Sequence, residues 1–355
     1  MRIVVTGASG NVGSSLLRRL VSSGEHDVVG IARRPPTDGH PFDQVHWVPL
    51  DLTNHASPKT LRKTFRGADA VVHLAWGFQP SHDVRYLEEL GVGGTRRVLD
   101  AITAADVQHL VHMSSVGAYS PKQGNDPVDE SWPTEGVPTS PYSQHKSAAE
   151  RLLDTHEQAR PDAVVTRLRP GIVGQRSAGS SLLRYGVPAA VPSKVIDLLP
   201  VLPLDRRLAI PMVHADDVAD AIDRALGAKA PGAFNLSAEP AVTPHHIAAS
   251  LEARFFHVPA PVLRAAMSLA WHARLQQVDP GWLDLGYAVP LMDTTRASRE
   301  LGWSATVDAV SVLDETVSGM RAASADDTAV LRPRTVAGQL GRLVRRGPIS
   351  QRRLP

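Results

Sequence analysis

Short apolar runs and amphipathic stretches alternate along the first half of the chain. The apolar runs are rich in β-branched residues and lie at residues 2–6, 28–32, 45–50, 70–75, 109–114 and 163–168. Strands of this kind are typical of a parallel sheet that is covered by helices on both faces. Amphipathic spacing predicts helices between them at residues 11–23, 61–66, 85–104 and 141–156. The pattern therefore predicts an α/β fold with a doubly wound parallel sheet.

The pattern changes after residue 169. Residues 186–211 carry five prolines among many aliphatic residues, which suits an irregular apolar lobe better than another strand–helix unit. A helix at 216–226, a strand at 233–236, a helical stretch within 259–290 and a final helix near 307–323 are expected to follow. From residue 324 the chain turns polar and then arginine-rich, which predicts a solvated tail. The alternative is a basic helix for an acidic partner or a membrane surface.

Composition narrows the range of functions. The chain is 43% hydrophobic and 21% charged, as in an ordinary globular protein, and its formal net charge is only +2. No nucleic-acid partner is therefore expected. The absence of cysteine excludes disulfides, thiolate catalysis and cysteine-ligated metals, and no metal site is expected. The sequence shows neither a secretory signal nor an apolar stretch long enough to span a membrane, so a cytoplasmic protein is expected.

A glycine-rich turn follows the first strand. Residues 6–13 read TGASGNVG, with Gly7, Gly10 and Gly13 spaced G-x-x-G-x-x-G between a strand and a helix. Glycines permit a tight turn and a close approach to a pyrophosphate, which the start of the following helix also attracts. The loop, including Ser9, Asn11 and Val12, is therefore predicted to bind a dinucleotide in a Rossmann-type domain. A glycine turn without a ligand is the alternative.

The end of the second strand indicates which dinucleotide is bound. An acidic residue there would hold the ribose hydroxyl of NAD, but the strand ends in Ala32 and is followed by Arg33 and Arg34. A guanidinium suits the additional phosphate of NADP, so NADP is the expected cofactor, with NAD as the other possibility. The alternative is that both arginines are solvated loop residues.

Residues 139–153 read TSPYSQHKSAAERLL, which predicts a helix with Ser140 as its N-cap and Pro141 in its first turn. Tyr142 and Lys146 are four residues apart and share one helix face. A nearby ammonium lowers the pKa of a phenol, which makes the tyrosine useful for proton transfer at neutral pH. Ser115, at the carboxyl end of a strand, is the expected partner for a substrate oxygen, with Ser114 as the alternative.

Together these residues resemble the extended short-chain dehydrogenase/reductases, also called the NAD-dependent epimerase/dehydratase family, over roughly residues 1–320. The resemblance implies cofactor contacts by Asp51 and Leu52, by Leu74 and Ala75 of VVHLA, and by Pro170 and Val173 of RPGIVG. MVHADDVADAI and DTTRASRELGW resemble two late signatures of the family, which are mainly structural. One residue departs from the family pattern, because Gly91 stands where family members often carry asparagine.

The resemblance also implies a domain organisation and a function. We expect a dinucleotide-binding domain at residues 1–174 and 205–238, a substrate-binding lobe at 175–204 and 239–323, and a basic tail at 324–355. The expected function is an NADP(H)-dependent oxidoreductase that transfers a hydride between nicotinamide and a carbonyl or alcohol of a small, moderately apolar substrate. A homodimer through helices 85–104 and 142–156 is expected, as in relatives.

Two alternatives remain open. One is a nucleotide-sugar epimerase or dehydratase with tightly bound NAD(P), in which Arg176, Arg206 and Arg207 contact phosphates. The other is a non-catalytic NADP-sensing regulator whose basic tail contacts a partner.

Overall fold

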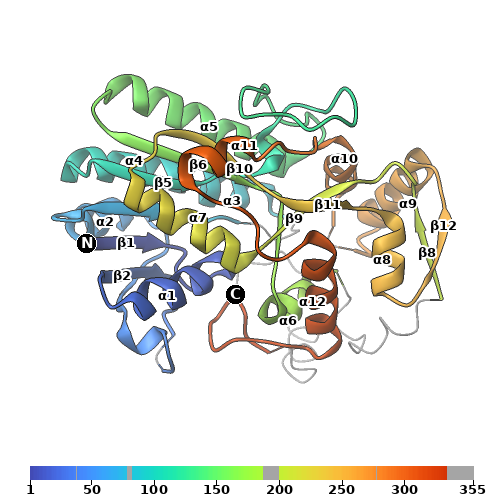
Figure 1. Cartoon of the computed structure of the whole chain (residues 1–355), viewed down its shortest axis with the longest axis horizontal. Coiled ribbons are helices and arrows are strands. Elements are labelled where there is room, and N and C mark those ends of the chain that lie inside the picture. The colour runs from blue at the N-terminus through green and yellow to red at the C-terminus, as the bar shows by residue number, and fades with distance from the viewer. Residues whose placement is uncertain (37, 78–81, 187–199, 277, 334–355) are drawn as a thin grey trace.

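The computed structural model describes the whole chain except residues 37, 78–81, 187–199, 277 and 334–355 (Figure 1). Its centre is a parallel sheet of seven strands in the order β10-β6-β5-β4-β1-β2-β3. These strands are β1 (Arg2–Thr6), β2 (Asp27–Ala32), β3 (His46–Pro49), β4 (Ala70–His73), β5 (His109–Met113), β6 (Val164–Pro170) and β10 (Gly232–Leu236). The predicted doubly wound sheet is confirmed, and each predicted strand lies within two residues of the observed one.

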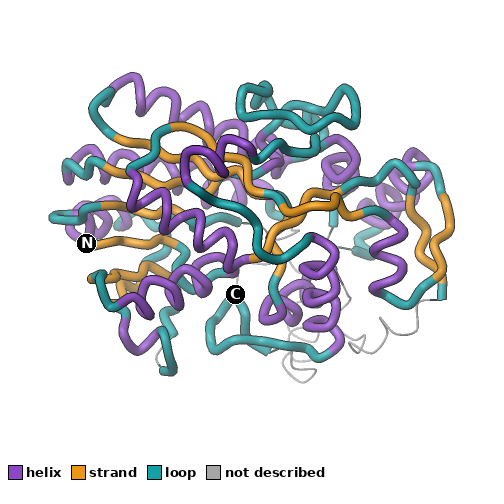
Figure 2. The backbone as a smooth tube through the Cα atoms, in the orientation of Figure 1, coloured by secondary structure: helices purple, strands orange, loops and turns teal. Residues whose placement is uncertain are grey.

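Helices cover both faces of this sheet (Figure 2). Alternate residues of β1 show why: Ile3 and Val5 belong to one hydrophobic core, and Val4 to the other. The first core is closed by α1 (Asn11–Ser23), α7 (Ala215–Ala228) and α11 (Thr295–Leu301). The second is closed by α2 (Ser57–Phe65), α4 (Gly94–Ala105) and α5 (Pro141–Ala159). The order of the strands reverses between β1 and β4, where ligands of open α/β sheets bind.

The helix predicted at residues 85–104 is not continuous. It is divided into α3 (Val84–Glu88), a π-helical turn η2 (Glu89–Gly93) and α4. Three glycines occur in the sequence LGVGGT at this point, and glycine gives little intrinsic preference for a regular α-helix. The wider turn η2 brings Gly91 beside the end of β4, as the contact with Trp76 described below shows.

A second region adjoins the sheet. It contains a three-stranded sheet of β7 (Ile172–Gly174), β9 (Ile210–His214) and β11 (Ala238–Val242), and a pair formed by β8 (Val201–Leu204) and β12 (Arg254–His257). Its helices are α6 (Gly179–Gly186), α8 (Pro244–Ser250), α9 (Ala260–His272), α10 (Pro280–Ala288) and α12 (Ala309–Arg321). Short 3-10 turns are η1 (Phe42–Gln44), η3 (Val116–Ala118) and η4 (Arg176–Ala178). The prediction of an irregular lobe at 186–211 is wrong for β8 and β9, which pair with distant strands, and residues 187–199 lie outside the described part.

The prediction of a solvated tail is wrong for its first residues. Thr328 and Leu331 are each 1% exposed. The Ser180 backbone N–H donates to the Ser324 carbonyl at 2.9 Å, and the Ser181 hydroxyl donates to the Val330 carbonyl at 2.5 Å. Residues 324–333 therefore pack against α6, because their few apolar groups find a partner there. The arginine-rich residues 334–355 lie outside the described part.

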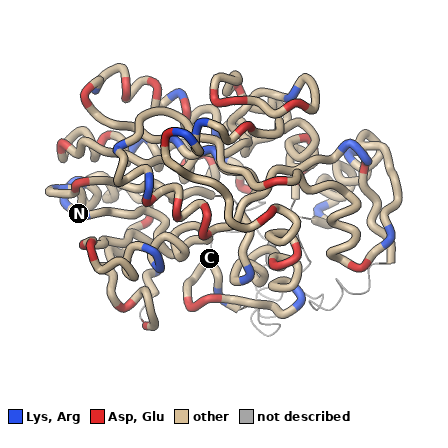
Figure 3. Tube along the Cα trace, in the orientation of Figure 1, with Lys and Arg blue, Asp and Glu red and all other residues tan. Residues whose placement is uncertain are grey.

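Charged residues of both signs are interspersed over the visible elements (Figure 3), as the small net charge leads one to expect. In the described part of the chain, no helix is both long enough and apolar enough to cross a membrane.

Candidate active site

The glycine turn after β1 needs its glycines for steric reasons. Gly7 has a φ of 72°, and a Cβ there would lie 2.7 Å from the backbone nitrogen of Ala75. A Cβ on Gly13 would lie 2.4 Å from the Gly7 carbonyl oxygen. Side chains at these positions would separate β1, β4 and α1, so the close packing depends on their absence.

The same turn leaves the start of α1 ready for an anion. The N-cap, Gly10, has no side chain to accept from the first backbone N–H groups, and the first turn contains no acidic residue. The Asn11 amide donates to the Val173 carbonyl at 3.0 Å, and Gln175 donates to the Asn11 side-chain oxygen at 2.7 Å. These contacts fix the turn against β7. The donor set and the helix dipole therefore suit a dinucleotide pyrophosphate.

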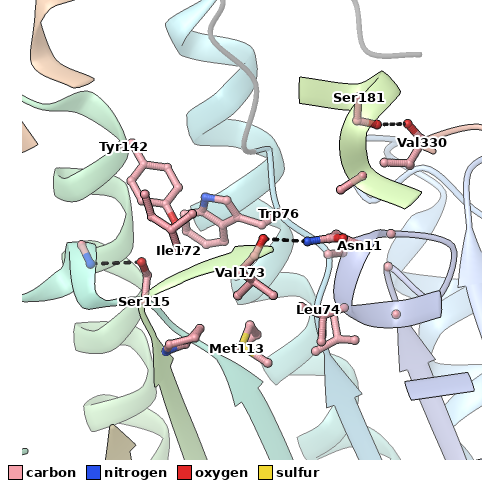
Figure 4. A pocket seen from close by; sticks show the side chains of 18 of the residues that line it. Asn11, Leu74, Trp76, Met113, Ser115, Tyr142, Ile172, Val173, Ser181 and Val330 are labelled. Carbon is pink, nitrogen blue, oxygen red and sulfur yellow. Dashed lines mark hydrogen bonds between the residues drawn. The ribbon is translucent and has the colours of Figure 1, made fainter. Parts of the chain in front are cut away.

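A pocket of about 470 Å³ runs from this turn along the carboxyl ends of the central strands. Two serines, Ser114 and Ser115, and aromatic side chains lie at its other end, as Figure 4 shows for Ser115, Tyr142 and Trp76. Most of the predicted site residues line it: Gly7, Ser9, Gly10, Asn11, Val12, Gly13, Arg33, Leu52, Leu74, Ala75, Ser115, Tyr142, Lys146, Pro170 and Val173. The alternative serine, Ser114, also lines it.

Two predicted cofactor contacts, Arg34 and Asp51, do not line the pocket. The Asp51 carboxylate turns back to accept from the backbone N–H and the hydroxyl of Thr53, at 2.9 and 2.8 Å. Arg33 does line the pocket, and it donates to the Tyr86 hydroxyl at 3.1 Å. Burial, together with the neighbouring charges of Arg332 and Arg33, lowers the pKa of Arg34. Arg34 therefore does not form part of the pocket wall, and its charge adds positive potential beside the pocket.

The start of α5 places Tyr142. Ser140 is the N-cap, as predicted, and its hydroxyl accepts from the Ser143 N–H at 3.5 Å. The tyrosine ring packs on η3, where a Cβ on Gly117 would lie 2.9 Å from the ring. Burial raises the pKa of Tyr142 to about 12, and a hydrogen bond with Ser115 opposes that rise. The sequence predicted a lowered pKa for Tyr142, and the chain alone does not produce it. Desolvation of the phenol outweighs the groups that favour the phenolate.

Lys146 lies one helical turn further along and is 2% exposed. Its ammonium donates to the Met113 carbonyl, at the end of β5, at 2.9 Å. Burial lowers the pKa of Lys146 to about 7, while the Glu150 carboxylate acts in the opposite direction. The amine can therefore gain or lose a proton near neutral pH, which suits a group that supports proton transfer.

Glu150, a further turn along α5, is the centre of a buried ion network. It accepts from the Ser114 hydroxyl at 2.5 Å, from Arg167 at 2.8 Å and from Arg169 at 2.9 Å. Burial raises its pKa, but the two guanidinium groups and Ser114 bring the pKa down to about 2. The Ser114 hydroxyl is thus engaged by this carboxylate, whereas Ser115 makes no hydrogen bond with it in the described part of the chain. Its Oγ accepts from the Gly117 N–H at 3.0 Å.

Four further residues line the pocket. For Trp76 and Trp282 the sequence left open whether they line a pocket or fill the core, and Val330 and Leu331 were not predicted. Trp76 follows β4, Trp282 comes from α10, and Val330 and Leu331 come from the segment after α12. The Trp76 and Trp282 rings lie 6.4 and 4.9 Å from the ring of Tyr142. For Trp76 the signal was its place directly after a strand that lines the cofactor. For Trp282 no local signal separated the pocket from the core, and Val330 and Leu331 gave no local signal.

The other charged candidates lie away from the pocket. Arg176 donates its backbone N–H to Glu315 and its side chain to Ser318, and Arg207 pairs with Asp205 at 2.9 Å. Neither arginine lines the pocket, and nor does Arg206. Within the described residues, no group of three or more His, Asp or Glu side chains could hold a metal ion.

Comparison with known families agrees with this geometry. Residues 3–237 match the family described as NAD dependent epimerase/dehydratase. This match covers more than half of the chain, and the chain therefore belongs to that family.

Individual relatives are more distant. An uncharacterised protein of Mycobacterium tuberculosis is 28% identical over 327 residues, which cover 90% of this chain but 30% of that protein. The chain thus spans less than a third of that relative. UDP-glucose 4-epimerase of Yersinia pestis is 26% identical over 332 residues, covering 85% of this chain and 92% of the epimerase.

A solved structure supports the same fold. The UDP-glucose 4-epimerase of Stenotrophomonas maltophila, with bound NAD and formylated UDP-arabinopyranose, superposes with a TM-score of 0.68 at 22% identity. The superposition covers 91% of this chain and 98% of that one.

Proposed function

We propose that this chain is a nicotinamide-dependent enzyme that moves a hydride to or from an alcohol or carbonyl carbon of a nucleotide sugar. The observation that carries the proposal is the position of Ser115, Tyr142 and Lys146 in one pocket with the uncapped start of α1. A polar trio at one end and an anion-binding turn at the other fit a substrate held beside a dinucleotide.

In this proposal Ser115, Tyr142 and Lys146 have different roles. The Ser115 hydroxyl holds the substrate oxygen, and the Tyr142 phenol gives or takes the proton of that oxygen. Lys146 supports the phenolate electrostatically and is oriented by the Met113 carbonyl. A bound nicotinamide dinucleotide would supply or accept the hydride. Gly7–Gly13, Leu74, Ala75, Pro170 and Val173 would hold it.

The nucleotide-sugar substrate class is supported by the relatives. The Yersinia pestis protein is a UDP-glucose 4-epimerase, and it aligns along nearly its whole length. The three arginines expected to contact the diphosphate are not in the pocket. Other hydrogen-bond donors must therefore bind the diphosphate. The backbone N–H groups near the start of α6 are candidates, because that helix starts at the pocket wall.

A second candidate is an NADP(H)-dependent reductase of a moderately apolar carbonyl compound. Among the described residues that line the pocket there is no carboxylate to hold an NAD ribose, whereas Arg33 lines it and Arg34 lies close to Arg33 and Arg332. The wall around Tyr142 is formed by Trp76, Trp282 and aliphatic side chains. These features favour a 2′-phosphate and an apolar substrate.

Cofactor release separates the two candidates. We expect the purified protein to carry NAD that does not exchange and to interconvert UDP-sugars without net consumption of NADH. Stoichiometric oxidation of NADPH with a carbonyl panel would instead establish the reductase. Arg33→Ala should weaken NADP binding more than NAD binding if the reductase is correct, and both alike if it is not.

The role of Tyr142 is tested by Tyr142→Phe. Turnover should fall by about 10²–10⁴-fold while dinucleotide affinity, measured by fluorescence titration, stays within about twofold. Activity retained in this variant would remove Tyr142 from the mechanism. Gel filtration would test the proposed homodimer, for which the neighbouring helices α4 and α5 form the proposed face.

A further inference from the structure

The Trp76 indole covers the Lys146 ammonium. The Lys146 nitrogen lies 3.7 Å from the ring centroid, within the range of a cation–π contact. The same indole meets the Tyr142 ring edge-on, with an interplanar angle of 83°. Figure 4 shows both aromatic side chains at the same end of the pocket, near Ser115. One aromatic ring thus touches both residues of the helical pair.

Gly91 leaves the space that this indole occupies. A Cβ on Gly91 would lie 3.0 Å from both Cη2 and Cζ2 of Trp76, closer than side chains normally approach. Gly91 lies in the π-helical turn η2, and Trp76 lies after β4, so the two meet only in the folded chain. Gly91 is also the residue that departs from the asparagine often found in the family. Gly91, which departs from the family pattern, and Trp76 therefore depend on each other for their packing.

We propose that Trp76 is a positioning residue for Lys146, and that the glycine at position 91 is the gap that admits it. The indole face and the Met113 carbonyl hold the ammonium from two directions. The proposal rests on the function proposed above, in which Lys146 supports the Tyr142 phenolate.

The surroundings of Lys146 make this contact important. The ammonium is 2% exposed, so water compensates little of its charge. His73 of β4 and His112 of β5 interact with it electrostatically. Burial lowers the pKa of both histidines far enough to keep them neutral at pH 7. Glu150 is the charged group that favours the ammonium. Glu150 also binds two arginines, so its charge is shared, whereas Lys146 is the cation that lies over the Trp76 ring.

The first test changes the electrostatics of the ring and keeps its shape. Trp76→tetrafluorotryptophan, introduced at this site only, removes most of the negative potential of the indole face. The chain has six lysines, so NMR titration of labelled lysine can follow Lys146, assigned by its loss in Lys146→Met. We expect the Lys146 titration midpoint to fall by about one pH unit. An unchanged midpoint would overturn the proposal.

The second test uses the packing. Gly91→Ala should push the indole aside, lower the Lys146 midpoint and lower the melting temperature by about 1–3 °C. Gly94→Ala is the matched control: a Cβ there has its nearest neighbour at 3.4 Å, a side-chain atom of Leu52. It should leave the midpoint unchanged.

A double variant completes the design. In a Trp76→Ala background, Gly91→Ala should lose its effect on both the midpoint and the melting temperature, because the atoms that it would meet are gone. If Gly91→Ala acts equally with and without the indole, the two residues are not coupled and the proposal fails. None of these readouts uses turnover. An active Tyr142→Phe variant would therefore refute the proposed reaction, and these titrations would still report on Trp76.

Discussion

Helix α5 carries two buried charges one turn apart, and they are compensated very differently. Glu150 is 1% exposed and receives hydrogen bonds from Ser114, Arg167 and Arg169. Lys146 is 2% exposed and, among the described residues, donates one hydrogen bond, to the Met113 carbonyl, besides its contact with the Trp76 ring.

The difference separates a charge that stays fixed near neutral pH from one that can titrate there. Surrounding cations lower the pKa of Glu150 to about 2, so it stays ionised at any physiological pH. The pKa of Lys146 is lowered to about 7 because burial exceeds its compensation. A fully paired charge ties strands β5 and β6 to the helix, whereas an underpaired charge remains able to respond to a bound molecule.

The largest expected effect comes from breaking the paired charge. Glu150→Gln leaves Arg167 and Arg169 buried without their shared carboxylate, and we expect the free energy of unfolding to fall by about 3–5 kcal/mol. Urea denaturation measures it. Asp154→Asn is the matched control, since Asp154 also contacts Arg167 but its side chain is 52% exposed. That change should cost less than about 1 kcal/mol. Equal losses in the two variants would refute the distinction.

Removing the underpaired charge should have the opposite signature. Lys146→Met removes a buried cation whose desolvation cost is only partly offset by its contacts. The free energy of unfolding should therefore stay level or rise by about 1–3 kcal/mol. Turnover should nevertheless fall by about 10²–10⁴-fold. Denaturation and an activity assay on the same preparation measure the two effects. A stability loss as large as that of Glu150→Gln would mean that Lys146 is structural.

The smallest expected effect is a difference in pH dependence. Between pH 7 and 10.5 the folded Lys146 binds fewer protons than the unfolded one, so its contribution to stability increases as the pH rises. Between pH 4.5 and 2 the unfolded Glu150 takes up a proton before the folded one, so its contribution is lost as the pH falls. Each slope is at most about 1.4 kcal/mol per pH unit. The alkaline slope should disappear in Lys146→Met and persist in Asp154→Asn.

Local sequence signals predicted the sheet and most of the pocket. The glycine turn, Ser115, Tyr142 and Lys146 each follow from a pattern within a few residues, because strand ends and helix faces are set locally. Asp51 was misplaced because its carboxylate accepts from Thr53 in a local turn. Arg34 was misplaced because its burial, and the charge of Arg332 that acts on it, depend on the folded chain. The fit of Trp76 to Gly91 joins segments that meet only after folding. The role of residues 324–333 was missed because their few apolar side chains resemble those of a solvated tail.

The π-helical turn η2 also sets the angular phase of the helix on either side of it. A π turn holds one residue more than an α turn, and each residue advances an α-helix by about 100°. Tyr86, which accepts from Arg33, precedes η2, and Val98 and Ile102 of the buried face follow it. Deleting a single residue from Glu89–Gly93 would leave Val98 and Ile102 in the core. It would rotate Tyr86 about the helix axis, away from Arg33. The additional residue thus keeps the Tyr86 hydroxyl in place for Arg33 while Val98 and Ile102 stay in the core.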